Sequence, residues 1–308
     1  MPNTITNAKL IEFPKALSTE MFNSVRGHSS LAQLSAARPQ SFAGNTEFAF
    51  SIDGEAEIVG EGDQKGAGTA KFKPVVRVPV KFIYSHRVSD EFLYQTAEAR
   101  VPVLQAFAEG FSKVIARGMD IAAMHGINPR TGLESSVVGD NHFDKVVTKT
   151  ATYAAGVKEA DDALDEAIEA VITAQRDVNG IAMASIYGSA MGKIKVNGVP
   201  QYPEFRLGGS PDKLGDKVID LNTTINKKLS TAAERDMAIV GDFANAFRWG
   251  YAENVKLEVI EYGDPDGLGD LKRQNQVCLR SEAFIGWAIM DADSFARVVE
   301  EVEPGQTS

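Results

Sequence analysis

Alternating apolar and polar residues mark two stretches in the first third of the chain. Between residues 46 and 59, large apolar residues alternate with polar or small ones, and a second alternating stretch runs from Val76 to Tyr84. A period of two is typical of β-strands that bury one face. Residues 60–70 lie between the two stretches and hold four glycines but no large apolar residue. The pattern therefore predicts a long β-hairpin with a glycine-rich tip.

This hairpin needs a partner, because a two-stranded ribbon is marginally stable when alone in water. Pro79 lacks the backbone N–H that a sheet ladder requires, which predicts that its strand lies at an edge. Edge strands and extended projections favour pairing with another chain. Either the rest of the chain or a second chain is expected to cover the ribbon.

Helical periods follow the hairpin. Ser89 is a candidate N-cap for a helix over residues 89–125, whose apolar stripe after Pro102 fits a period of 3.6 residues. Pro102 is expected to interrupt or restart this helix. Residues 158–176 predict a second helix, with acidic side chains in its first half, as the helix dipole favours.

The remaining segments predict a mixed arrangement of strands and short helices. "GIAMASIYGSAMGKIKV" indicates a strand and then a helix, and residues 275–290 are long enough for a bent strand. The middle of the chain, about 150–250, is expected to form one α/β lobe. The segments before and after it are then expected to pair with each other as a second lobe.

The N-terminal residues 1–40 form a weakly amphipathic segment. Leu17, Met21 and Val25 share a rough helical spacing that Gly27 interrupts. Such a short helix gains little from propensity and needs a surface to pack on. That surface is either the chain's own domain or a neighbouring subunit.

Composition narrows the class of protein. The chain has 308 residues, is 44% hydrophobic and 24% charged, and carries a net charge of −10. An acidic chain without clustered Lys and Arg does not predict binding to nucleic acid through phosphate neutralisation. One cysteine, Cys278, excludes an intrachain disulfide. No stretch has the length of a signal peptide core or a membrane span, so we expect a soluble protein made in a cytoplasm.

Motifs that carry chemistry are missing from the sequence. The glycine-rich tip lacks the spacing of a phosphate-binding loop, and "GDPDGLGD" is better explained as a turn than as a calcium loop. Cys278 is expected to be a packed small residue. The four histidines are scattered and are expected to be ordinary surface or loop residues: His28, His86, His125 and His142. We therefore predict no catalytic residue, no metal site and no cofactor.

Several stretches, taken in order, resemble one family of shell proteins. "PKALSTEMFNSVRGHSSLAQLS" resembles its N-terminal arm, and "AEIVGEGDQKGAGTAKFKPVVRVPVKFIYSHRVSDEFL" resembles its extended loop and the opening of its long helix. "FAEGFSKVIARGMDIAAMHGINPRTG", "MAIVGDFANAFRWGYAENVKLEVIEY" and "NQVCLRSEAFIGWAIMDADSFARV" resemble its helix end, late strand and closing strands. The family is the major capsid proteins of tailed bacteriophages, which have the Johnson coat-protein fold.

The resemblance implies a fold and a set of boundaries. The fold class is α+β, a phage capsid (Johnson) fold with an N-terminal arm, an extended β-hairpin loop, a long spine helix, and peripheral and axial domains. The expected boundaries are 1–46 for the arm, 47–88 for the loop, 89–149 with 251–308 for the peripheral domain, and 150–250 for the axial domain. The spine helix is expected at about 89–125.

The resemblance also implies a function and partners. The chain is expected to self-assemble as hexamers and pentamers into an icosahedral phage head that encloses double-stranded DNA, within the bacterial host cytoplasm. Further expected partners are a separate scaffolding protein or none, and portal and decoration proteins. No sequence-specific nucleic-acid binding, no membrane and no cofactor are expected. The acidic balance fits a shell that does not bind its DNA tightly.

Contacts between subunits are expected in the loop and in the arm. The loop residues are Val59, Glu61, Gly62, Lys65, Lys71, Lys73, Arg77 and Lys81, and the arm residues are Phe13, Leu17, Met21 and Val25. Some relatives crosslink a loop lysine to an asparagine, but nothing in this sequence marks the partner. Two alternatives stay open at this point: an encapsulin-like nanocompartment shell, and an α/β enzyme with a hairpin lid.

Overall fold

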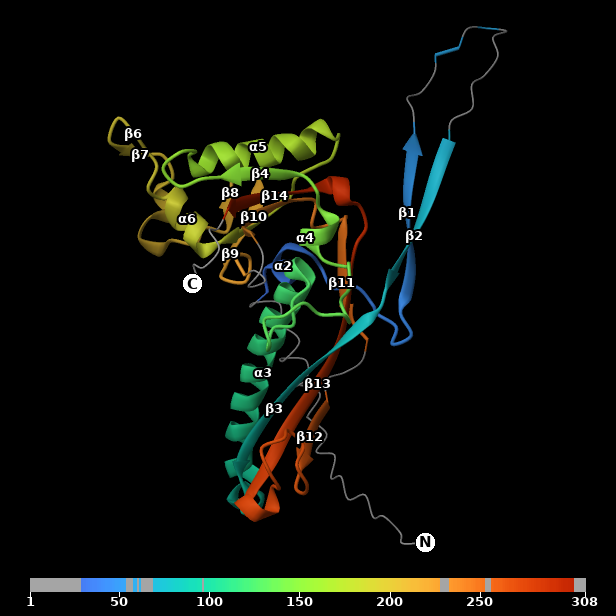
Figure 1. The fold of residues 1–308 in the computed structure, drawn as a ribbon, viewed down its shortest axis with the longest axis vertical. Helices are drawn as coiled ribbons and strands as arrows, with labels where there is room; N and C mark the ends of the chain where they lie inside the picture. Colours follow the sequence, from blue (N-terminus) through green and yellow to red (C-terminus); the bar gives the residue numbers. More distant parts are fainter. Residues whose placement is uncertain are drawn as a thin grey trace.

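Two larger sheets and one long helix organise the chain in a computed structural model. The structure describes residues 29–53, 58–59, 61, 69–95, 97–227, 233–252 and 256–301. Figure 1 shows a six-stranded sheet with its helices in the upper part, a long helix beside a four-stranded sheet in the lower part, and a hairpin that stands away from both. The assignment of the two sheets to axial and peripheral domains stays a prediction.

The elements follow one another along the chain as follows. The helices are α2 (Ser30–Leu34), α3 (Ala97–His125), α4 (Phe143–Val146), α5 (Ala160–Thr173) and α6 (Ser185–Met191), with short 3-10 helices η1 (Asp90–Tyr94), η2 (Pro203–Gly208), η3 (Lys272–Gln274) and η4 (Ala292–Ser294). The strands are β1 (Asn45–Asp53), β2 (Thr69–Arg77), β3 (Pro79–Ser89), β4 (Thr150–Tyr153), β5 (Gly180–Ala184), β6 (Lys195–Val196), β7 (Val199–Pro200), β8 (Lys213–Leu214), β9 (Lys217–Asn222), β10 (Glu234–Gly241), β11 (Phe247–Tyr251), β12 (Lys256–Ile260), β13 (Gln276–Ile289) and β14 (Phe295–Glu301).

The predicted β-hairpin is present, but it is shorter than expected. β1 and β2 pair antiparallel from Asn45 opposite Arg77 to Asp53 opposite Thr69. The alternating stretch from Val76 to Tyr84 is not one strand: it breaks at Val78, and β3 pairs with β13 instead. A strand that continues to residue 59 is also wrong, since Ile58 and Val59 lie outside any strand. The alternation correctly predicted β-strand, but it does not show that the chain passes from one sheet to another within the stretch.

The four-stranded sheet is built around β13. β3 lies along one side of β13, and β12 and β11 follow each other along its other side. The long strand predicted over 275–290 is therefore confirmed. Among the described strands β3 pairs only with β13, so the edge position predicted from Pro79 is confirmed as well.

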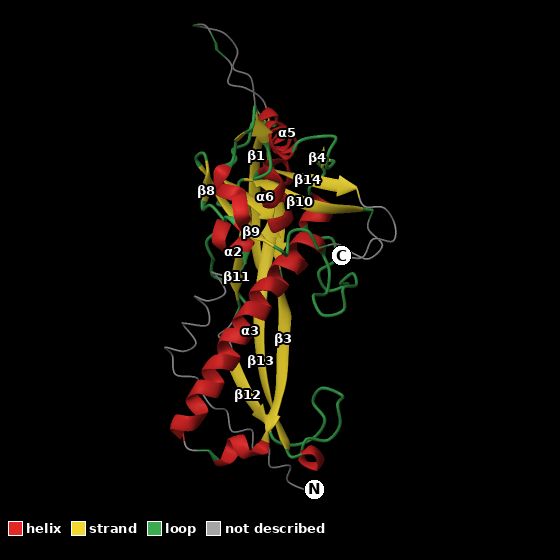
Figure 2. Cartoon of the chain, turned by 90° about the vertical axis from the view of Figure 1, so that its left-hand side faces the viewer, coloured by secondary structure: helices red, strands yellow, loops and turns green. Residues whose placement is uncertain are grey.

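The long helix α3 packs against this sheet, as Figure 2 shows. It has 29 residues, which is about 44 Å at the usual rise, and it ends at His125 as predicted. Ser89 caps η1 rather than α3: its Oγ accepts from the Glu91 N–H. Pro102 does not interrupt α3. It lies near the solvent-exposed start of the helix, where its missing N–H removes one backbone bond.

The six-stranded sheet has the order β4-β14-β10-β5-β9-β8, with α5 running across it. This order differs from the expected division of the chain. β14, at the C-terminal end, pairs with β10 and β4 rather than with the sheet beside α3. β11, which was expected in the middle lobe, pairs with β13. Among the described strands, the chain therefore crosses between the two sheets three times: between β3 and β4, after β10, and again after β13.

The junction between the two sheets holds an aromatic core. Phe143, in α4, is fully buried, and its ring lies 5.5 Å from that of Phe247 on β11 and 5.0 Å from that of Phe295 on β14. Phe243, between β10 and β11, packs against Phe143 and Phe295 as well. α4, which itself lies in the crossing between β3 and β4, thus contacts residues from both later crossings. None of the helices in the described residues is long and apolar enough to cross a membrane.

Candidate intersubunit interface

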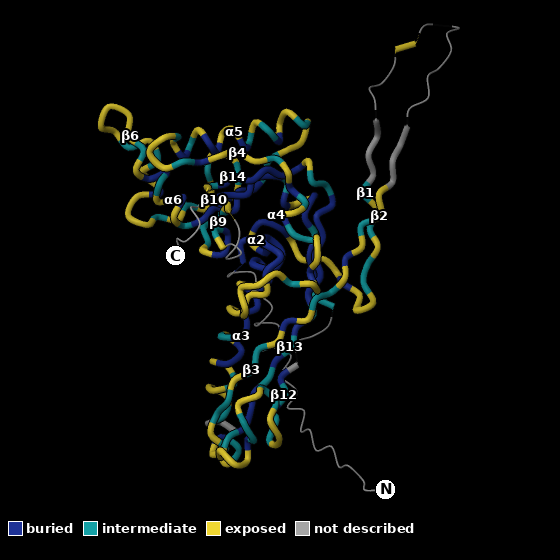
Figure 3. The backbone as a smooth tube through the Cα atoms, viewed as in Figure 1, coloured by how far each residue is buried: buried dark blue, intermediate teal, exposed yellow. Residues whose placement is uncertain are grey.

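The β1–β2 hairpin has two faces of different character. In an antiparallel pair, residues opposite each other project on the same side. Thr46 lies opposite Val76 and Phe48 opposite Pro74, and Phe48 and Val76 are 64% and 56% exposed. Figure 3 shows this part of the hairpin apart from the buried core. We call Thr46, Phe48, Pro74 and Val76 the outer face; in this chain it is an apolar strip facing solvent.

The opposite face of the hairpin is held by a buried arginine at its root. Arg77 is 1% exposed, and its Nη2 lies 3.1 Å from Glu47 Oε1 and donates to the Pro39 carbonyl oxygen at 2.8 Å. Glu47 also pairs with Arg248 on β11. Burial lowers the pKa of Arg77, which Glu47 partly offsets. These contacts fix the direction in which the hairpin leaves the body.

Between the two sheets lies a second charged group, which we call the junction quartet: His125, Asp144, Asp236 and Arg297. His125 Nδ1 lies 2.9 Å from Asp144 Oδ2, and His125 Nε2 donates to the Thr224 carbonyl oxygen at 3.0 Å. Arg297 donates to Asp236 Oδ1 through Nε at 2.9 Å and Nη2 at 2.7 Å. The prediction that His125 is an ordinary surface or loop residue is therefore wrong.

The quartet shifts the pKa values of its members in opposite directions. Burial acts to lower the pKa of His125, but Asp144 and Asp236 outweigh burial and raise it above its usual value. Burial and the like charge of Asp144 raise the pKa of Asp236. Burial also acts on Asp144, but His125 and Arg297 lower its pKa well below the usual range. The quartet therefore retains a proton at pH values where free groups would lose it.

Three donor atoms of this group come close enough together to suggest a metal ion. Single ligand atoms of His125, Asp144 and Asp236 lie within 4.8 Å of one another. However, the guanidinium of Arg297 already bonds Asp236 and lies 3.3 Å from Asp144 Oδ1, so a cation is in place. A divalent ion there would face that guanidinium in a buried site. The donor set fits an ion-pair network and does not fit a metal centre.

Comparison with known proteins decides the family. The model of the phage capsid family matches residues 13–299. The chain belongs to the phage capsid family. This capsid protein is thus a major capsid protein of an icosahedral phage head, and the matches do not favour a nanocompartment shell or a lidded enzyme. No curated protein matches the chain.

Solved structures agree with the family match. A protein from Mycobacterium phage Ogopogo is 29% identical, with 89% of this chain and 92% of that chain covered and a TM-score of 0.75. A protein from Gordonia phage Cozz is 24% identical, over 89% of this chain and 87% of that one, with a TM-score of 0.72. The capsid of a native GTA particle has the same fold at 14% identity, with a TM-score of 0.58 over 89% of this chain and 90% of that one. The expected phage capsid fold is confirmed.

The loop residues predicted from the sequence have different settings in this capsid protein. Lys73, Val59 and Glu61 are exposed, as intersubunit contacts require. Arg77 is buried within its own subunit, where it holds the root of the hairpin. Its side chain is therefore not exposed for the predicted contact with a neighbouring subunit. Lys81 lies on β3 outside the hairpin and pairs with Glu282 at 2.8 Å.

The other predicted contacts cannot be placed in the same way. Lys71 belongs to β2, but its side chain lies outside the described residues, as do Gly62, Lys65 and the arm residues Phe13, Leu17, Met21 and Val25. The part of these residues in assembly stays a prediction. What the sequence missed is the outer face as a unit, because the register that joins Phe48 to Pro74 is not visible in either strand alone.

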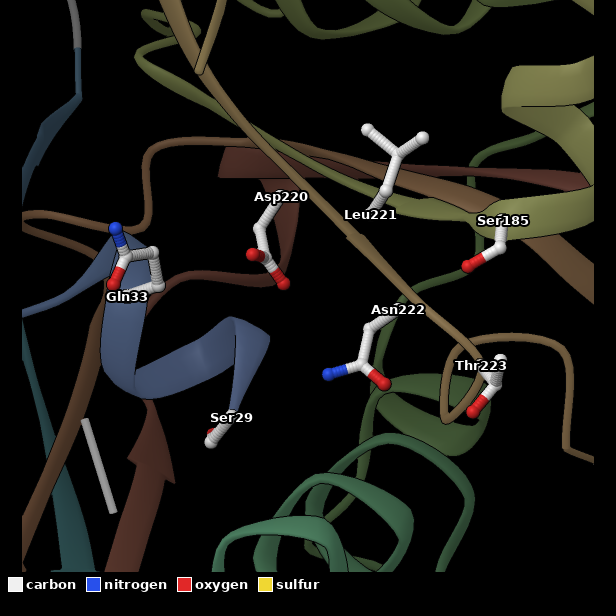
Figure 4. Close-up of a pocket in the computed structure, with 7 residues that line it drawn as sticks. All are labelled: Ser29, Gln33, Ser185, Asp220, Leu221, Asn222 and Thr223. Atoms are coloured by element: carbon white, nitrogen blue, oxygen red, sulfur yellow. The ribbon is translucent and has the colours of Figure 1, made fainter. Parts of the chain in front are cut away.

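A small cavity near α2 offers little chemistry for an enzyme. It has a volume of about 290 Å³ and is lined by Ser29, Gln33, Ser185, Asp220, Leu221, Asn222 and Thr223 (Figure 4). Asp220 is its one titratable lining residue, and it accepts a hydrogen bond from Ser30 Oγ. Paired acid and base groups, which catalysis by side chains requires, do not line this cavity. Membership of a capsid family likewise indicates a structural role.

Proposed function

We propose that this capsid protein assembles as hexamers and pentamers around double-stranded DNA, and that the β1–β2 hairpin packs its outer face on a neighbouring copy. One observation carries the second part: an apolar strip lies exposed on a hairpin whose root is fixed by Arg77 and Glu47. A flexible ribbon would lose entropy on docking, whereas a fixed root reduces that cost. Scaffolding, portal and decoration proteins remain further expected partners.

The contact made by one hairpin is expected to be weak, and its effect on assembly comes from its repetition in every subunit. Burying one large apolar side chain contributes about 1.5–3 kcal/mol, and Phe48 and Val76 each offer such a side chain per subunit. A shell repeats the contact at every subunit, so modest pairwise energies add.

The net charge of −10 supports enclosure of DNA without tight binding, because like charges repel at the inner wall.

Polar substitutions in the outer face test this proposal. We expect Phe48→Ser combined with Val76→Ser to leave the subunit folded, because both side chains face solvent. Particle yield in electron micrographs is expected to fall at least about tenfold, since roughly 1.4 kcal/mol lost per contact already gives that factor. Val157→Ser is the matched control, because Val157 is 89% exposed but lies before α5, away from the hairpin. Normal particles from the double variant would contradict the proposal.

Deletion of the glycine-rich tip is a separate test. Removing residues 60–70 is expected to leave a soluble, folded subunit while impairing shell formation or shell stability. The deletion shortens β2 by Thr69 and Ala70, but the remaining pairing of β1 with β2, from Asn45 opposite Arg77 to Ser51 opposite Lys71, still holds the hairpin root. Circular dichroism and size-exclusion chromatography report the fold, and electron microscopy reports the shells. If the deletion unfolds the subunit, the tip belongs to the fold rather than to assembly.

Nuclease-resistant DNA in purified particles separates a phage head from a cargo-filled shell.

A further inference from the structure

Independently of how subunits meet, we propose that the junction quartet is a protonation-dependent lock between the end of α3 and the six-stranded sheet. Its four side chains come from four elements: His125 ends α3, Asp144 lies in α4, and Asp236 and Arg297 lie on β10 and β14. His125 also bonds the segment after β9 through the Thr224 carbonyl oxygen. The quartet therefore ties the long helix to the sheet at one buried point.

The charges of the quartet balance in one protonation state. With a proton on His125 there are two cations, His125 and Arg297, and two carboxylates, Asp144 and Asp236. Loss of that proton leaves one uncompensated negative charge, and His125 and Asp236 are both 1% or less exposed in their side chains. An unpaired charge at a buried site is strongly unfavourable. The neutral quartet is thus the stable form of the junction.

The geometry makes the same proton necessary for a hydrogen bond. His125 Nε2 must carry hydrogen, because its partner is a carbonyl oxygen, which only accepts. Nδ1 faces Asp144 Oδ2 at 2.9 Å and Asp236 Oδ2 at 3.9 Å, both of which are acceptors when ionised. Asp236 Oδ2 is buried and has no hydrogen-bond partner among the described residues. If Nδ1 loses its proton, a lone pair faces carboxylate oxygens and the contact becomes repulsive.

The neighbouring groups do not supply a replacement charge. His142, just before α4, is near His125, but burial lowers its pKa, so it is neutral where His125 is still charged. Asp140 lies near His142 and Glu234 near Arg297, and both add negative charge. Asp140 and Glu234 therefore increase the need for a proton on the quartet, and His142 supplies no positive charge in its place.

The sign of the pH effect follows from these directions. The pKa values of His125 and Asp236 are both raised, so the folded junction binds its proton more tightly than the unfolded chain does. Their contribution to stability is complete at low pH and is lost as pH rises through the raised values. Asp144, with its lowered pKa, acts oppositely, but its contribution is lost only in strong acid. With the proton on His125, rising pH therefore releases the lock.

Two variants and a matched control test the lock in the full-length chain. Urea unfolding and amide exchange around His125 and Asp236 are followed between about pH 5 and 8. The unmodified chain is expected to lose stability at the junction as pH rises. In His125→Gln this part of the pH dependence is expected to vanish. Asp144→Asn is expected to move this pH dependence to lower pH by about 1–3 units. His86→Gln changes an exposed histidine on β3 and is expected to leave the profile unchanged.

Further measurements keep the proposal testable if a variant fails to fold. The ring resonances of His125 in the unmodified folded chain are expected to titrate with a pKa above the ordinary histidine value. A pKa below that value, or an unchanged pH profile in a folded His125→Gln chain, overturns the proposal. In the last experiment, stability is measured after addition of zinc ions or of a chelator. A stability change with either one in the unmodified chain but not in His125→Gln would identify a metal site and exclude the lock.

Discussion

Replacing Phe143 by alanine is expected to lower the free energy of unfolding by about 3–5 kcal/mol. Phe143 is fully buried, and its ring contacts Phe243, Phe247 and Phe295, which lie at the crossings that follow β10 and β13. The cavity left by alanine cannot close by a local shift, because the surrounding rings belong to two different sheets. A loss of this size is a large part of the stability of a typical domain.

Urea denaturation followed by circular dichroism checks this effect, read as a fall in the midpoint at constant slope. Phe48→Ala makes the same chemical change at a residue that is 64% exposed, and it is expected to alter subunit stability by no more than about 0.5 kcal/mol. Phe143→Leu is expected to recover part of the loss, since it refills much of the volume. Equal effects of Phe143→Ala and Phe48→Ala would show that the junction is not a stability centre.

Elements with a local signal were predictable from the sequence. The hairpin, the end of α3 at His125 and the long β13 each follow from a spacing of residues that are close in the chain, whereas Ser89 caps η1 and not the long helix predicted to begin there. The predicted interruption at Pro102 was wrong. The destabilisation that a proline causes depends on its distance from the start of the helix, and the start of α3 at Ala97 has no strong capping residue in the sequence. Periodicity therefore identified most elements but not all their ends.

Features that depend on strand partners were not predictable. Val78 looks like one more alternating residue, yet the chain leaves one sheet for another there. Arg77 falls in a strand that continues toward exposed positions, and only Glu47, Pro39 and Arg248 around it explain its burial. The members of the junction quartet are far apart in the chain: His125 and Arg297 are separated by 172 positions. Scattered charged residues form such a site only after the sheets have paired.

Glu47→Ala is the second substitution with a large expected effect. Arg77 Nε and Nη1 have no hydrogen-bond partner in the described residues, so Glu47 supplies the main compensation for this buried charge. Its removal leaves Arg77 and Arg248 near each other without their shared carboxylate. Breaking a buried ion pair from one side costs about 3–5 kcal/mol. We expect the lower end of that range, because Glu47 is not fully buried.

A double-mutant cycle isolates this interaction. Arg77→Met removes the charge that Glu47→Ala leaves behind, so the double variant is expected to recover most of the lost stability. Glu282→Ala is the matched control: it breaks the half-exposed pair with Lys81 and is expected to cost about 0.2–1 kcal/mol. Urea midpoints give the stabilities, and amide exchange in β1 reports the hairpin root. If Glu47→Ala costs no more than Glu282→Ala, the root is not held by charge. The direction of the hairpin then depends on two hydrogen bonds, from Arg77 Nη2 to the Pro39 carbonyl oxygen and from Gln40 Nε2 to the Arg77 carbonyl oxygen.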